Sequence, residues 1–198
     1  VVYITPLSLA LVRFLYVSIC FIIIDIIKYF HSKYNSQTTI EKSQSYPCTK
    51  KNFLRSNWLL LIVASLTGIA LFFFAQYSAI QIMGPSLPAL FVCLLAPLLI
   101  SIFALILFKE KLNKYKIFGF TIATIGGFLL VTGGDLSVLH PNSPNFLGYF
   151  FALLTPVLWS IYSTTSKKLM LKNSRESPMT IIKYTSYFGT IELFIFVL

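Results

Sequence analysis

Long apolar runs that are nearly free of charge constrain this chain more than any other feature. Six of them approach the roughly 20 residues that a helix needs to cross a hydrocarbon core of about 30 Å. They cover residues 4–27, 58–80, 86–108, 117–133, 146–166 and 178–198. Charged residues make up only 11% of the chain, less than half of the ~25% typical of a soluble domain. We therefore predict an integral membrane protein with six transmembrane segments.

Helix is the expected state of these segments. An open sheet edge in lipid would leave backbone hydrogen-bonding groups without partners, and the runs lack the alternation of apolar and polar residues found in barrel strands. The predicted fold class is therefore all-α.

Basic residues are confined to alternate connections. Fourteen of the sixteen Lys and Arg residues lie in segments 28–57, 109–116 and 167–177, whereas the connections 81–85 and 134–145 contain none. By the positive-inside rule, the three basic segments are cytoplasmic. We expect a multi-pass protein of the plasma membrane, in contact with the lipid bilayer.

The segment 109–116, KEKLNKYK, is predicted to be a tight cytoplasmic turn containing Lys109, Glu110 and Lys114. Glu110 could act as a gating or coupling carboxylate. We favour a structural role, in which it pairs with Lys114 at the i, i+4 spacing of a helix.

The remaining composition argues against other classes of protein. The formal net charge of +10 would suggest nucleic-acid binding on a soluble surface, but here its placement follows topology. The cysteines Cys20, Cys48 and Cys93 show no metal-binding or disulfide spacing. We expect no metal and no cofactor.

Two segments read alike: residues 5–17, TPLSLALVRFLYV, and residues 177–189, SPMTIIKYTSYFG. Each begins with a hydroxyl residue and proline, which suits the first turn of a helix. They lie five predicted spans apart and so run in opposite directions, as in transporters built from inverted repeats. With five helices in each unit, the whole protein would have ten, and this chain would lack the first and the last three.

Several of these stretches resemble the EamA-type transporters of the drug/metabolite transporter superfamily. LFKEKLNKYKIFGFTIATIGGFLLVTGG is similar to that family's fourth-helix end, basic turn and fifth helix, and TPLSLALVR to the start of its second helix. NFLGYFFALLTPVLWSIYSTTSKKL resembles the opening helix of the second half. The resemblance implies a ten-helix carrier, with residues 1–134 in the first repeat, 135–145 in an extracytoplasmic loop and 146–198 opening the second repeat.

Arg13 and Glu192 are the charged residues placed deepest in the predicted spans. Ionisable groups at such depth are costly and are usually functional or paired. We expect the two side chains to pair with each other or with a charged group of the substrate. Lys183 can reach the cytoplasmic interface and is given no role.

Prolines and polar aromatic residues suggest a solute pathway. Pro97 and Pro156 interrupt predicted spans near mid-membrane, where broken helices often line transport cavities. Further candidates are Trp159, Tyr162, Gln76 and Tyr77. The alternative is that these residues serve only hydrogen bonding between helices and placement at the membrane interface.

Gly119, Ala123 and Gly127 recur at four-residue spacing and form a small face on which a second helix can approach closely. This face could mediate a homodimer. We favour packing within the chain.

The predicted function is a secondary transporter for small organic metabolites or drugs, working by alternating access. The sequence contains no phosphate-binding GxxxxGK[ST] motif. Glu192 is the deepest carboxyl group available for coupling to protons. The alternatives are a membrane-embedded lipid-modifying enzyme and a non-transporting scaffold.

Overall fold

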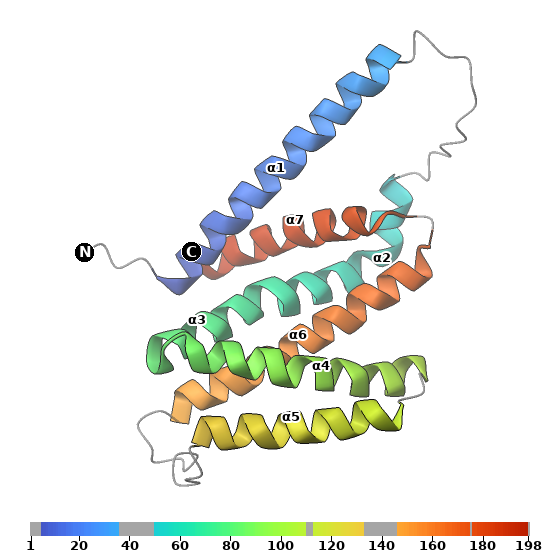
Figure 1. Cartoon of the computed structure of the whole chain (residues 1–198). Coiled ribbons are helices and arrows are strands. Elements are labelled where there is room, and N and C mark those ends of the chain that lie inside the picture. The colour runs from blue at the N-terminus through green and yellow to red at the C-terminus, as the bar shows by residue number, and fades with distance from the viewer. Residues whose placement is uncertain (1–4, 36–49, 110–112, 133–145, 175, 198) are drawn as a thin grey trace.

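The computed structural model describes residues 5–35, 50–109, 113–132, 146–174 and 176–197 (Figure 1). The elements within these ranges are helical, as predicted. They are α1 (Pro6–Asn35), α2 (Lys50–Ser65), a π-helical turn (Leu66–Ala70, the π-segment), α3 (Leu71–Met83), α4 (Ser86–Phe108), α5 (Lys114–Thr132), α6 (Phe146–Lys172) and α7 (Pro178–Val197).

Four stretches of helix in the described part of the chain are long and apolar enough to cross a membrane. They are Leu7–His31, Phe53–Met83, Ser86–Phe108 and Phe146–Lys172. The second runs through α2, the π-segment and α3. Within α5, the apolar helix Ile117–Gly127 is shorter, and α7 carries Lys183 and Glu192 among several hydroxyl residues. Six membrane spans therefore stay a prediction.

The connections that contain the basic residues are shorter than predicted, because the helices continue into the basic segments. α1 continues to Asn35, α2 begins at Lys50 and α6 ends at Lys172. The prediction that residues 28–35, 50–57 and 167–172 lie in loops is wrong. Lysine and arginine are good helix formers, and their long side chains extend toward water from a helix end, so a change to basic composition does not end a helix.

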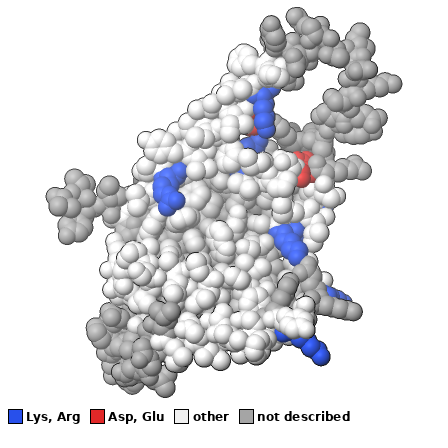
Figure 2. Space-filling view, in the orientation of Figure 1, with Lys and Arg blue, Asp and Glu red and all other residues white. Residues whose placement is uncertain are grey.

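α6 lies at the centre of the bundle, in contact with α2, the π-segment, α3, α4 and α7. α5 packs on α4 at one edge, and α1 packs on α7 and α3 at the other, slanting away from the rest (Figure 1). Figure 2 shows a face that is almost entirely uncharged. Most of the basic side chains in view lie toward its right-hand side, where Figure 1 places the ends of α4 and α6.

The similar segments found in the sequence begin their helices in similar ways. The Ser8 backbone N–H donates to the Thr5 hydroxyl over 3.3 Å, and the Met179 backbone N–H donates to the Ser177 hydroxyl over the same distance. A proline follows each hydroxyl residue as the first residue of α1 and of α7.

α1 and α7 run antiparallel and are joined by polar side chains. The Ser18 and Thr190 hydroxyl oxygens lie 2.9 Å apart. Seven residues later in α1 and seven earlier in α7, Lys183 Nζ lies 2.9 Å from Asp25 Oδ2. The expectation that Lys183 has no role is therefore wrong: it forms an ion pair that ties the two helices together.

Two described residues, Lys109 and Asn113, flank the connection between α4 and α5. Lys109 closes α4 in the left-handed conformation, with φ 53° and its backbone N–H bonded to the Ala104 carbonyl. The Asn113 side chain accepts a hydrogen bond from the Tyr115 backbone N–H before α5 begins at Lys114. Glu110 lies outside the described residues, so its pairing with Lys114 stays a prediction.

Candidate functional site

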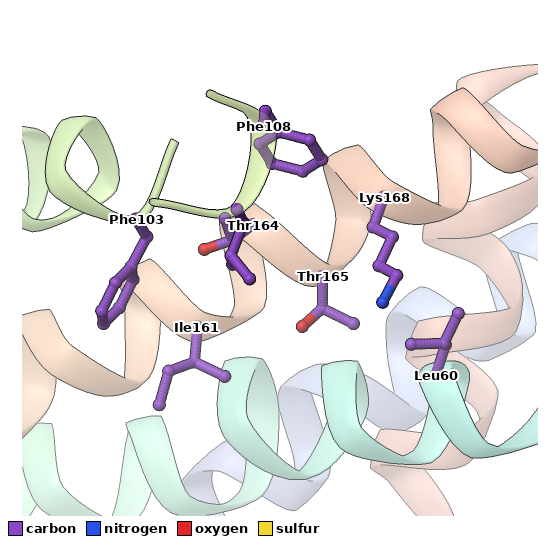
Figure 3. A pocket seen from close by; sticks show the side chains of 8 residues that line it. Leu60, Phe103, Phe108, Ile161, Thr164, Thr165 and Lys168 are labelled. Carbon is purple, nitrogen blue, oxygen red and sulfur yellow. The ribbon is translucent and has the colours of Figure 1, made fainter. Parts of the chain in front are cut away.

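A cavity of about 350 Å³ lies between α2, α4 and α6, near the ends that carry the basic residues (Figure 3). This volume falls within the range of small-molecule pockets. Most of the lining is aliphatic or aromatic, and three polar residues of α6 complete it. The lining residues are Leu60, Phe103, Leu107, Phe108, Ile161, Thr164, Thr165 and Lys168.

The polar residues are spaced so that one face of α6 presents them to the cavity. Thr164, Thr165 and Lys168 lie within about one helical turn of each other. Thr164 donates its hydroxyl hydrogen to the Ser160 carbonyl of its own helix. Figure 3 shows Thr165 and Lys168 next to each other, both turned toward α2. These two have no hydrogen-bonding or ionic partner among the described residues.

The end of α6 is fastened to the start of α2, which fixes the position of Lys168. Asn57 Nδ2 donates to Asn173 Oδ1 over 3.2 Å, and Lys172 Nζ donates to the Ser56 carbonyl over 3.3 Å. Lys167 lies 4.8 Å from the centre of the Phe108 ring. These contacts position the polar end of the cavity, and none of them involves the Lys168 side chain.

Beyond the cavity, α6 packs closely on the π-segment through aromatic residues. The rings of Trp159 and Tyr162 lie 5.2 Å apart, and Trp159 lies 5.0 Å from Phe72. Gly68 of the π-segment allows the Tyr162 ring to approach, since a Cβ at Gly68 would overlap with it. Trp159 and Tyr162 therefore lie at a helix contact, and Ile161 and Thr164 on the same stretch of α6 line the cavity.

Arg13 and Glu192 do not pair with each other. Arg13 Nη1 donates to the Tyr77 hydroxyl over 2.8 Å, and its guanidinium carbon lies 5.6 Å from the Phe73 ring centre. The structure thus brings together two predicted pathway residues, Arg13 and Tyr77. Similar predicted depth did not make Arg13 and Glu192 partners, because depth says nothing about which side of a helix a residue occupies.

Glu192 bonds instead to the residue that precedes the π-segment. Ser65, which is fully buried, donates its hydroxyl hydrogen to Glu192 Oε1 over 2.7 Å. The other carboxyl oxygen, Oε2, is buried and has no hydrogen-bond partner. The buried oxygen Oε1 of Gln76 also has none. These oxygens are acceptors available to a proton, a solute or an adjoining helix.

Neither Pro97 nor Pro156 lines the cavity. Ser160 of α6 donates its hydroxyl to the Pro156 carbonyl over 2.6 Å, and its oxygen also lies 3.3 Å from the Ala96 carbonyl of α4. Pro156 is fully buried, whereas Pro97 is exposed. The buried Ser160 hydroxyl thus contacts the carbonyls of Pro156 and of Ala96, the residue before Pro97, and the role of the prolines as hinges stays a prediction.

The small face of α5 divides into two parts. A Cβ at Gly127 would overlap with Leu94 of α4, so this end packs within the chain. Gly119 has open space around it, and Ala123 is half-buried between them. A homodimer through this face stays a prediction.

Sequence reasoning missed the cavity because Lys168 was counted as a topology signal in a loop. The spacing of Thr164, Thr165 and Lys168 could have revealed it, had the helix been extended past Ser166. No Gly or Pro follows Ser166 until Pro178, and that absence was the available signal.

Comparisons with known proteins give one family and two relatives named as transporters. The model of the EamA-like transporter family matches residues 1–132. The chain is 27% identical over 146 residues to the uncharacterized transporter YyaM of Bacillus subtilis, covering 74% of this chain and 46% of that protein. It is also 27% identical over 143 residues to an uncharacterized transporter of Archaeoglobus fulgidus, covering 72% and 47%. The chain thus spans about half the length of these relatives. No solved structure was found to be significantly similar.

Proposed function

The chain belongs to the EamA-like transporter family, and we propose that it is part of a secondary transporter that moves small organic metabolites or drugs by alternating access. Its apolar helices and its transporter relatives support a multi-pass membrane transporter. The proposal goes further in naming the class of cargo and the mechanism.

The cavity between α2, α4 and α6 is the observation that carries the proposal. It has the volume of a small-molecule site, and its apolar walls can hold an organic body while hydroxyl and ammonium groups bind a polar end. It also lies against α6, which contacts most of the other helices. A shift of α6 would therefore be transmitted to both sides of the bundle.

We propose that the solute passes from this cavity along the aromatic contact at the π-segment toward Arg13 and Tyr77. The proposed pathway consists of Arg13, Gln76, Tyr77, Pro97, Pro156, Trp159, Tyr162 and Glu192. Support comes from the Arg13–Tyr77 hydrogen bond and from the buried oxygens of Gln76 and Glu192 that have no partner.

Glu192 is proposed to couple transport to protons, because its carboxyl group can exchange a proton while Ser65 holds it in place. We expect Glu192→Gln to keep the hydrogen bond with Ser65 and to abolish uptake driven by a pH gradient. Arg13→Gln is expected to lower uptake equally with and without a pH gradient. If both variants transport and fold like the wild type, these roles are wrong.

We further propose six spans, with the basic segments in the cytoplasm, within a protein of two inverted five-helix units. The antiparallel course of α1 and α7, and their matching first turns, support this arrangement. Ser174→Cys is expected to react with a membrane-impermeant thiol reagent only from the cytoplasmic side. Ser86→Cys is expected to react only from outside. Each is made in a background lacking the native cysteines, and labelling of both from one side would refute this orientation.

Counterflow in proteoliposomes tests the transport function directly. Proteoliposomes that contain the full-length protein are loaded with an unlabelled solute, and the entry of the same solute in labelled form is measured. The measurement is repeated for each solute of a metabolite panel. Leu60→Trp, which fills the cavity, is expected to lower the flux at least tenfold. Ile122→Trp, on an exposed position of α5, adds the same side chain elsewhere and is expected to leave the flux unchanged.

The same experiment separates the competing functions. A lipid-modifying enzyme would return a chemically altered solute or lipid, which mass spectrometry of the vesicle contents would detect. A scaffold would give no saturable flux for any solute of the panel. Either result would overturn the proposal.

A further inference from the structure

We propose that the cavity between α2, α4 and α6 selects small amphiphilic organic anions, with Lys168 and Thr165 binding the acidic group. This inference rests on the proposed transport function and names the class of solute. Its first basis is Lys168, a cation at the edge of an apolar cavity with no anionic partner among the described residues.

The surrounding charges favour an anion. None of the lining residues is acidic. Of the described acidic residues, Asp25 is paired with Lys183 and Glu192 is bonded to Ser65, while Glu176 lies in the connection after α6, outside the lining. Lys172 lies one turn after Lys168 on α6, bonds only the neutral Ser56 carbonyl among the described residues, and adds to the positive potential. A cationic solute would be repelled from this end of the cavity.

Alternating access strengthens the argument. When the cavity closes to water around a solute, an ammonium group without a counter-charge would be desolvated at considerable cost. A neutral solute leaves that cost in place, whereas a carboxylate, phosphate or sulfonate removes it through a charge-assisted hydrogen bond. The Thr165 hydroxyl, turned to the same side (Figure 3), can donate a second hydrogen bond to the acidic group.

The rest of the lining describes the body of the solute. Phe103 and Phe108 offer aromatic rings, and Leu60, Leu107 and Ile161 offer aliphatic surface. A volume of about 350 Å³ lies near the lower end of the range for small-molecule sites. The cavity therefore fits a single ring or a short chain with one acidic group.

Binding of three matched probes to the full-length protein in phosphatidylcholine nanodiscs tests the inference. Phenylacetate, phenylethanol and phenylethylammonium share a benzene ring and differ in charge. We expect phenylacetate to bind at least tenfold more tightly than the other two. Equal affinities, or preference for the cation, would overturn the inference.

Variants of the polar end locate the binding. Lys168→Gln is expected to weaken phenylacetate binding about tenfold, as for loss of a hydrogen bond to a charged group, and to leave phenylethanol within about twofold. Lys168→Arg is expected to retain the anion, and Thr165→Val to weaken it about threefold. Lys28→Gln removes a charge from an exposed position of α1, outside the lining, and is expected to have less than a twofold effect. Equal losses at Lys168 and Lys28 would mean that the anion is attracted only by net charge.

The source of the anion is separated by lipid composition. Adding phosphatidylglycerol to the nanodiscs is expected to leave phenylacetate binding unchanged. Competition by that lipid, lost in Lys168→Gln, would assign the site to a lipid headgroup and overturn the proposed solute.

Counterflow with the same probes distinguishes this inference from the transport function. Flux of a neutral solute without anion preference would overturn the inference and leave transport standing. Lys168-dependent binding without counterflow of any solute would support the site and refute transport.

Discussion

Two helix pairs at opposite edges of the bundle, α1 with α7 and α4 with α5, both contain serine and threonine, yet they use these residues differently. Between α1 and α7, the Ser18 and Thr190 hydroxyls meet across the interface. In α4 and α5, Ser101, Thr121 and Thr124 each donate to a carbonyl of their own helix, four residues earlier.

The difference shows which contact specifies a geometry. Lipid is as apolar as a leucine surface, so helices in a membrane are positioned by close packing and by hydrogen bonds between them. The hydroxyl contact and the Asp25–Lys183 ion pair lie two turns apart and fix both the register and the antiparallel sense of α1 and α7. α4 and α5 depend on a short connection and on packing.

Breaking the ion pair is expected to have the largest effect. Lys183 is the more buried partner, with 12% of its side chain exposed against 42% for Asp25. Asp25→Leu strands the buried ammonium and is expected to lower the free energy of unfolding by about 3 kcal/mol. Lys183→Leu leaves the more exposed carboxylate and is expected to cost about 1 kcal/mol.

Unfolding of the purified protein in mixed micelles measures both values. The double variant is expected to be more stable than Asp25→Leu alone, because no unpaired charge remains. If the losses of unfolding free energy in the two single variants add up in the double variant, the two side chains do not interact. The ion pair would then not stabilise the contact of α1 with α7.

Glycine substitutions in α7 and α5 are expected to change stability by an intermediate amount. In α7, a Cβ at Gly189 would lie 2.9 Å from Ile69 Cβ in the π-segment. Gly189→Ala is therefore expected to destabilise by about 1–3 kcal/mol. In α5, Gly119 faces open space, and Gly119→Ala is expected to stabilise by about 0.5–1 kcal/mol through helix propensity. Thermal denaturation in detergent gives both signs, and destabilisation by Gly119→Ala would reveal a partner for α5.

Hydroxyl deletions give the smallest effects. A double-mutant cycle of Ser18→Ala and Thr190→Val is expected to show a coupling of about 0.6 kcal/mol, the average for hydrogen bonds between membrane helices. Thr121→Val removes a bond within one helix and is expected to change stability by less than about 0.5 kcal/mol. A coupling near zero for the first pair would erase the difference between the two edges.

The helix ends could be predicted from the sequence where a glycine or a proline marks them. α4 covers the predicted residues 86–108, and Phe146 and Pro178 begin α6 and α7 as predicted. Gly84, with φ 79°, and Pro85 separate α3 from α4, and such residues are strong punctuation. The basic ends gave no such mark, so α1, α2 and α6 were predicted too short.

The site was less predictable because it depends on which faces of the helices meet. Arg13 and Glu192 were recognised as deep, but the register set by Asp25 and Lys183 directs them to Tyr77 and Ser65. Lys168 was visible only as a charge, and its place beside Thr165 in a cavity depends on packing between α2, α4 and α6. A single sequence specifies position along a helix better than direction around it.

The π-segment makes one long helix behave as two differently oriented surfaces. A π-turn accommodates one residue more than an α-turn, which rotates everything after it by about 100° around the axis. Before the π-segment, α2 directs Leu60 toward the cavity and Ser65 toward Glu192. After it, α3 directs Tyr77 toward Arg13. Because the extra residue rotates α3 relative to α2, a substitution in α2 can change the contacts near the cavity while the contact of α3 with Arg13 stays the same.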